Sequence, residues 1–178
     1  MKSSLIFVMF LLVVNYTPDV LAAEKIKDKI YATQMKPYAK YRKCIRYTAE
    51  TFNLPEMLIL SVLKTEGGSL GQCNRISSEK NKQMDNTTDC GPMQINNVRS
   101  QQIADIGLSY KEIKSSACKN IVAGGYILAS EIKKSGDFWS GVGNYHYHKK
   151  GPAPKHHYKY INLVYKNWQS LLTVKDQA

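Results

Sequence analysis

The sequence predicts one mostly α-helical domain of about six helices, with a disulfide-stapled irregular segment or small hairpin after the second helix. Apolar residues recur with helical spacing in six stretches from residue 40 onward. Residues 69–90 interrupt this pattern with a polar stretch, and two cysteines, Cys73 and Cys90, bracket most of it. No internal repeat is present, and the length suits one domain with its own hydrophobic core.

The first 22 residues have the layout of a secretory signal peptide. Lys2 precedes an unbroken apolar run over residues 5–14, and Pro18 and a small-residue site ending at Ala22 follow it. Such a run is too short to span a bilayer, so we expect cleavage after Ala22 and no stable membrane anchor afterwards. The protein would then be exported. Residues 23–39 would form a polar lead-in, and residues 40–178 the domain.

The first two predicted helices lie on either side of a break at residues 53–55. The helix over residues 40–52 has its apolar side chains on one face. The next helix begins near Pro55, a residue that suits a first helical turn, and it ends at Gly67 and Gly68. Because this second helix is apolar on nearly every side except at Lys64, we expect it to be buried.

Four further helices follow the polar stretch. A pair of adjacent glycines, Gly124 and Gly125, lies inside the helix expected over residues 117–134. Each glycine costs about 1 kcal/mol of helix stability relative to alanine, so we expect another element to pack closely there. Asp137 has the character of an N-cap for the helix expected over residues 137–147. The four helices are expected over residues 97–106, 117–134, 137–147 and 156–172, with a short turn at 109–113.

The four cysteines lie in the exported part of the chain, which indicates two disulfide bonds. Three pairings are open from the count alone. The segment between Cys73 and Cys90 has few apolar anchors, so a disulfide there would add about 3 kcal/mol of stability. We therefore favour Cys73–Cys90, which leaves Cys44–Cys118 to join two helices. A metal site is the alternative, but the spacing of the cysteines does not support it.

The formal charge of the chain is +11, which favours polyanionic partners such as cell-wall polymers, anionic lipid or nucleic acid. The Lys and Arg residues are scattered, and no nucleic-acid-binding motif accompanies them, so we expect no nucleic-acid binding. The four histidines straddle a Gly-Pro linker and lack acidic companions, which favours packing or solvated histidines over metal ligands.

Glu66 stands at an electrostatically unfavourable place. It ends an apolar helix, where the helix dipole disfavours an anion by about 0.3–1 kcal/mol. The dipole and partial burial would both raise the pKa of the carboxyl. Glu66 is therefore either a tolerated surface glutamate or a carboxylic acid that keeps its proton near neutral pH.

Three motifs in this order resemble the lysozyme-like lytic transglycosylases, the SLT-domain family. They are TEGGS at residues 65–69, CGPMQINN at 90–97 and GVGNYHYH at 141–148, with the helix NIVAGGYILAS at 120–130 between the last two. The resemblance covers residues 40–172. It is closest to small exported members that accompany secretion, conjugation or pilus machines, and it implies an α+β lysozyme-like fold.

The resemblance implies a role for several residues. Glu66 falls at the position of the family's single catalytic acid, and Met93 and Gln94 match the MQ pair that lines the cleft beside it. Asn96 follows in the same motif, and Tyr145 matches a tyrosine that helps to hold substrate.

The sequence also departs from the family pattern, chiefly in residues expected to contact the substrate. Gly67 replaces the usual Ser after the acid, and Pro92 stands where an apolar residue is common. His146 replaces the usual Asn, which supports the secretion-associated subgroup. We include Gly67 and His146 among the expected substrate contacts.

Glycosidases ordinarily need two carboxyl groups. The candidates for a second one are few: Asp85 and Asp89 in the polar loop, and Asp137 at a helix start. Asp89 can cap or orient the MQIN turn, and Asp137 is expected as an N-cap. Glu66 would therefore act alone, as the resemblance implies. It would cleave the bond between N-acetylmuramic acid and N-acetylglucosamine in peptidoglycan and close a 1,6-anhydro ring, without a cofactor or metal.

The expected protein is a monomer that binds peptidoglycan glycan strands, opens the wall locally and serves a trans-envelope machine. Two alternatives stay open: a muramidase that uses water, and a wall-binding assembly factor without catalytic activity. Retention of Glu66 argues against the second alternative, because a binder has no need of the acid.

Overall fold

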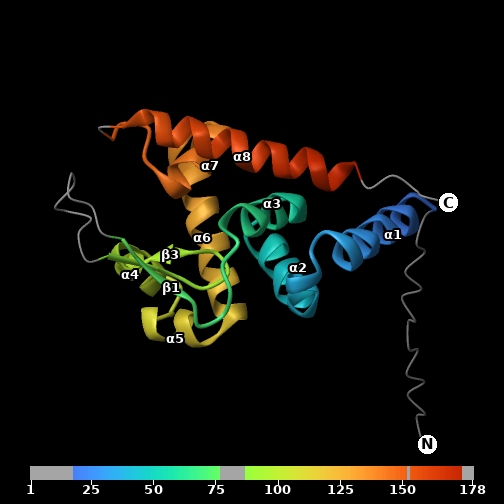
Figure 1. The fold of residues 1–178 in the computed structure, drawn as a ribbon, viewed down its shortest axis with the longest axis horizontal. Coiled ribbons are helices and arrows are strands. Elements are labelled where there is room, and N and C mark those ends of the chain that lie inside the picture. The colour runs from blue at the N-terminus through green and yellow to red at the C-terminus, as the bar shows by residue number, and fades with distance from the viewer. Residues whose placement is uncertain (1–17, 77–86, 152, 174–178) are drawn as a thin grey trace, which may run out of the picture.

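The computed structural model describes residues 18–76, 87–151 and 153–173. This part of the chain is mostly α-helical, with a small antiparallel sheet, so the fold class expected from the sequence is confirmed (Figure 1). The elements are α1 (Pro18–Thr33), η1 (Lys36–Tyr41), α2 (Arg42–Thr51), α3 (Glu56–Glu66), β1 (Cys73–Ile76), β2 (Thr87–Cys90), β3 (Ile95–Asn96), η2 (Asn97–Arg99), α4 (Ser100–Ala104), α5 (Tyr110–Ser115), α6 (Ala117–Ser135), α7 (Phe138–His146) and α8 (Pro154–Leu172).

Helix α3 is the central helix of the core, as its apolar sequence predicts. Its residues from Leu58 to Leu63 are fully buried. Helix α8 packs along α3 and α7, and α6 packs against α2, α5 and α7. In Figure 1, α8 lies across the top of the molecule above α3, while the sheet and α5 lie at the lower left. Helix α3 therefore ends between α8 and the sheet.

The glycine pair in α6 is explained by close packing on both sides. A Cβ atom at Gly125 would lie 2.1 Å from Cγ2 of Thr48 on α2, and one at Gly124 would lie 2.7–2.8 Å from side-chain atoms of Met93. The Cys44–Cys118 disulfide joins α2 to the start of α6. Helices α2 and α6 are thus in close contact, and the helix tolerates the weak propensity of glycine because no larger residue fits.

The irregular segment expected after the second helix contains a three-stranded sheet with strand order β1-β2-β3. Cys73 lies directly opposite Cys90 in the β1–β2 ladder, and the two form the second disulfide. Asn74 lies opposite Asp89, and Asp89 lies opposite Asn96 on β3. Because directly paired residues point to the same face of a sheet, these three polar side chains share one face.

Three expectations about individual elements were wrong or incomplete. The turn expected at residues 109–113 is largely helical, because Ser109 and Glu112 form a reciprocal capping box that starts α5. The helix expected over 97–106 is divided into η2 and the shorter α4. Strand β3 was not predicted, because two residues are too few to show the alternation of a strand.

The N-terminal lead-in is mostly helical. Helix α1 runs from Pro18 to Thr33, and Ile30 and Tyr31 near its end are buried in the core. Glu24 on α1 forms ion pairs with Arg42 and Arg46 on α2. The expected cleavage site after Ala22 falls inside α1, and residues 1–17 lie outside the described residues, so the signal peptide stays a prediction. Among the described residues, no helix has both the length and the apolar character needed to cross a membrane.

Candidate active site

Glu66 is the last residue of α3, and the following glycine ends the helix. Gly67 has a φ of 62° and donates its backbone N–H to the Leu63 carbonyl at 3.0 Å, as a left-handed C-cap does. A Cβ atom on Gly67 would meet nothing within 4 Å, so its conformation rather than crowding favours glycine here. The chain turns away from the helix axis at this point and leaves the Glu66 carboxyl at the helix end.

The next residue brings two of the sequence motifs together. A Cβ atom on Gly68 would lie 2.1 Å from the Gly91 carbonyl oxygen and 2.5 Å from Nε2 of Gln94. No side chain fits in this space, so only glycine allows the end of α3 to approach the turn at residues 91–94. Tyr38 stabilises the same segment, because its hydroxyl donates a hydrogen bond of 2.9 Å to the Gly68 carbonyl.

Glu66 is a partly buried acid with a raised pKa. Burial raises the pKa of Glu66 to about 7, and the negative charge of Asp89 adds to the rise. The hydroxyl of Tyr160 on α8 donates a hydrogen bond of 2.5 Å to Oε1 of Glu66, and this bond acts in the opposite direction. Near neutral pH the carboxyl is therefore poised between its protonated and ionised forms.

Aromatic rings from α7 fix the position of Tyr160. The ring of His146 lies parallel to that of Tyr160 with 4.7 Å between the centroids, and the ring of Tyr145 lies 6.3 Å away. His146 is exposed, so it can contact a bound molecule. Tyr145 is only 9% exposed and donates its hydroxyl to the Met93 carbonyl at 2.7 Å, so it holds the 91–94 turn in place.

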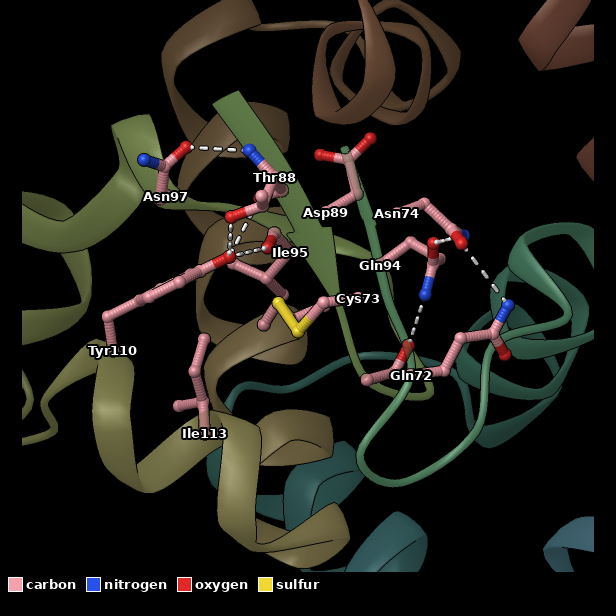
Figure 2. Close-up of a disulfide and its surroundings, with 12 residues drawn as sticks. Gln72, Cys73, Asn74, Thr88, Asp89, Gln94, Ile95, Asn97, Tyr110 and Ile113 are labelled. Atoms are coloured by element: carbon pink, nitrogen blue, oxygen red, sulfur yellow. Dashed lines mark hydrogen bonds between the residues drawn. A yellow bond between two sulfur atoms is a disulfide. The ribbon is translucent and has the colours of Figure 1, made fainter. Parts of the chain in front are cut away.

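Asp89 is the second carboxyl group beside Glu66. Burial raises its pKa, and a hydrogen bond from Nδ2 of Asn96 at 2.8 Å acts in the opposite direction. Asn96 also accepts from the Val98 backbone N–H at 3.0 Å, so its side chain positions Asp89 and starts η2. Figure 2 shows Asp89 on the same side of the strands as Asn74, with Thr88 on the other side.

Of the two residues of the MQ pair, Gln94 is accessible and Met93 is not. Gln94 has an unusual positive φ of 45°, donates through Nε2 to the Gly91 carbonyl at 2.8 Å and stays partly exposed. Met93 is fully buried, and its side chain packs on Gly124. The expectation that Met93 lines the cleft is therefore corrected: its side chain belongs to the core, and only its backbone contributes to the site.

Two residues near the site were missed in the sequence. Tyr160 is one of 12 tyrosines, and its partner Glu66 is 94 positions away, so no local pattern distinguishes it. Asn120 on α6 is fully buried, accepts from the Met93 N–H at 2.8 Å and donates to the Cys90 carbonyl at 2.9 Å. A polar residue on the buried face of the predicted 117–134 helix is the signal that could have revealed Asn120.

The described residues contain no group of three or more His, Cys, Asp or Glu side chains arranged to hold a metal ion. His157 is fully buried, and its Nδ1 lies 2.9 Å from the Tyr147 carbonyl. Its ring packs so close to Gly143 that a Cβ atom there would lie 2.5 Å away. His157 therefore has a packing role between α7 and α8.

Known proteins are similar to this chain in sequence. The chain is 27% identical to invasion protein IagB of Salmonella typhimurium over 135 residues, which cover 72% of this chain and 76% of that protein. It is 23% identical to protein IpgF of Shigella flexneri over 141 residues, which cover 79% of this chain and 89% of that protein. The family model described as the transglycosylase SLT domain matches residues 43–161, from α2 into α8, and so spans Glu66, the 91–94 turn and Tyr160. The chain therefore belongs to the transglycosylase SLT domain family.

Proposed function

We propose that this protein is a peptidoglycan lytic transglycosylase in which Glu66 is the catalytic acid and base. The observation that carries the proposal is the environment of Glu66. Burial and the charge of Asp89 raise the pKa of its carboxyl to about 7, and the hydroxyl of Tyr160 holds it in one orientation. A general acid works best when its pKa lies near the working pH. Membership of the SLT family supports the same reaction class.

In the first step, protonated Glu66 would donate its proton to the oxygen that links N-acetylmuramic acid to N-acetylglucosamine. The bond between that oxygen and C1 of the muramic acid then breaks, and N-acetylglucosamine leaves with a new hydroxyl group. Positive charge develops at C1, and the acetamido group of the same sugar can stabilise it, as in other substrate-assisted glycosidases.

In the second step, the Glu66 carboxylate would accept the proton of the C6 hydroxyl while the C6 oxygen bonds to C1. This closes the 1,6-anhydro ring and restores the protonated acid, so the cycle consumes no water. The hydrogen bond from Tyr160 stabilises the carboxylate between the two steps. One carboxyl group can perform both steps because its pKa favours neither form strongly near pH 7.

The other site residues would divide into contacts and supports. Gln94, His146 and Gly67 have accessible surface and would contact the sugars. Tyr145 and Asn96 would act indirectly, since Tyr145 holds the Met93 carbonyl and Asn96 holds Asp89. We place the activity in the periplasm, where it would open the wall locally for a trans-envelope machine; the name of one relative, an invasion protein, agrees with such a role.

A hydrolytic muramidase is the second candidate, and the position of Asp89 favours it. Asp89 lies on β2 near enough to Glu66 for its charge to raise the pKa of Glu66. Most glycosidases use a second carboxylate of this kind to activate water or to stabilise positive charge. In that reaction Glu66 would act as the acid and Asp89 as its partner.

The test is a digest of purified peptidoglycan with the oxidised chain and with its Glu66→Gln variant, analysed by mass spectrometry. Anhydro-muropeptides from the wild type alone would support the lytic transglycosylase. Products heavier by one water would indicate the muramidase. If neither form released fragments although both bound the glycan, the protein would be a binding factor and the catalytic proposal would be wrong.

A further inference from the structure

Three carboxamide side chains form a row that leads away from the end of α3. Nδ2 of Asn74 donates to Oε1 of Gln94 at 2.7 Å, and Nε2 of Gln72 lies 3.5 Å from Oδ1 of Asn74. Figure 2 shows the three side chains in sequence along one side of β1. Gln94 is the member nearest Glu66, because its Nε2 borders Gly68. Gln72 is the far end of the row.

Both ends of the row are fixed, so its side chains are oriented before any ligand binds. At the near end, Nε2 of Gln94 donates to the Gly91 carbonyl at 2.8 Å. At the far end, Oε1 of Gln72 accepts from the backbone N–H of Ser69 at 3.2 Å and from its hydroxyl at 3.1 Å. An oriented donor loses little conformational entropy when it binds, which favours affinity.

The row is not needed to hold β1 in place. Backbone pairing with β2 and the Cys73–Cys90 disulfide already join β1 to the rest of the sheet. The Gly91 backbone N–H also donates to the Gln72 carbonyl at 2.9 Å. A purely structural role would therefore be redundant, and it would not explain why Gln72 and Asn74 are exposed.

The chemistry of the row suits a neutral, hydroxyl-rich and amide-rich ligand. A carboxamide has two N–H donors and an oxygen with two lone pairs, and the contacts described above leave each of the three side chains with one N–H unused. The row carries no formal charge, so it offers no ion pair to a phosphate or carboxylate. The same sheet face continues through Asp89 to Asn96. The close approach of Gln94 to Gly68 joins the row to the end of α3, where Glu66 lies.

We propose that Gln72 and Asn74 bind N-acetyl and hydroxyl groups of sugar units that lie beyond those held at Glu66, so that the protein prefers longer glycan strands. This inference rests on the proposed function, because it assumes that the glycan lies across Glu66. Nothing in the SLT motifs assigns a role to either residue. The row would act on affinity and on the choice of strand length, and it would take no part in proton transfer.

The test measures binding without cleavage in the Glu66→Gln background, with peptide-free glycan fragments of two lengths, a tetrasaccharide and an octasaccharide. Adding Gln72→Ala and Asn74→Ala should weaken octasaccharide binding about tenfold, the loss of one or two neutral hydrogen bonds. Tetrasaccharide binding should change less than about twofold. Gln72→Ala alone leaves Gln94 untouched and should weaken octasaccharide binding about threefold.

The matched control replaces Asn162 and Gln169, two exposed carboxamide residues on α8, with alanine, and it should bind both fragments unchanged. Equal affinity of the row variant and its parent for the octasaccharide would overturn the inference while leaving anhydro-product formation by the wild type intact. The same measurement is repeated with an octasaccharide that carries stem peptides, and a loss seen only with that ligand would also overturn the inference, since the row would then bind peptide amides. If no glycan of either length bound to any form, both the inference and the proposed function would be wrong.

Discussion

The raised pKa of Glu66 predicts that the Glu66→Gln variant is more stable than the wild type, and only above a certain pH. In the folded protein the pKa of Glu66 is about 7, compared with 4.5 for an ordinary glutamate. The unfolded chain therefore binds fewer protons at this residue between these two values, so the free energy of unfolding falls as pH rises through that interval. Above pH 7 this effect lowers the free energy of unfolding of the wild type by about 2–3 kcal/mol. One pKa unit corresponds to about 1.4 kcal/mol, and the total is reduced somewhat because the side chain is partly exposed to solvent.

Glutamine has nearly the same shape and can still accept the hydrogen bond from Tyr160, but it does not ionise. We therefore expect equal urea midpoints for the two proteins near pH 4 and a higher midpoint for the variant at about pH 8, with equal m-values. Glu50→Gln, at an exposed glutamate on α2, is the control and should show no such divergence. A difference that is independent of pH, or a variant less stable than the wild type at about pH 8, would refute the assignment of a raised pKa to Glu66.

Three further predictions concern the partners of Glu66 and the sheet. Tyr160→Phe removes the hydrogen bond that stabilises the carboxylate, so the pKa of Glu66 in an NMR titration should rise further by about one pH unit or more. Asp89→Asn removes the neighbouring negative charge, so the same titration should give a lower pKa for Glu66 and the alkaline fall in activity should begin at lower pH. Replacing Cys73 and Cys90 with serine opens a loop of 17 residues and should cost about 3 kcal/mol in chemical denaturation, while the Cys44–Cys118 disulfide persists on a mass map.

The sequence predicted the elements whose signals are local. The long helix α6 was found from its periodicity, and Asp137 was expected as an N-cap; the structure shows its carboxylate accepting from the Ser140 N–H at 2.7 Å. The cysteine pairing was also deduced correctly, because a polar segment between Cys73 and Cys90 gains most from a covalent link. Each of these inferences needed only residues that are near in sequence or few in number.

The parts that could not be predicted depend on contacts between distant segments. Tyr160 contacts Glu66 only because α8 packs along α3, and no sequence pattern gives the rotation of one helix against the other. Met93 is buried because its side chain packs closely on Gly124. The glycine pair in the sequence predicts close packing at this point, but it does not identify the residue that packs there. The resemblance to the family identified the motif that contains Met93, but whether the Met93 side chain is accessible depends on the packing of this particular core.

The electrostatics of Glu66 bear on why the residue is a carboxylic acid. The end of a helix, a partly buried position and a neighbouring aspartate all disfavour a negative charge there, and the hydrogen bond from Tyr160 is what offsets them. A helix end selected for stability alone would carry a cation or a neutral side chain, and glutamine would keep the hydrogen bond at lower cost. The carboxyl group therefore has little value to the fold. The presence of a carboxyl group here is best explained by a reaction that uses both its protonated and its ionised form, which is the reaction proposed for Glu66.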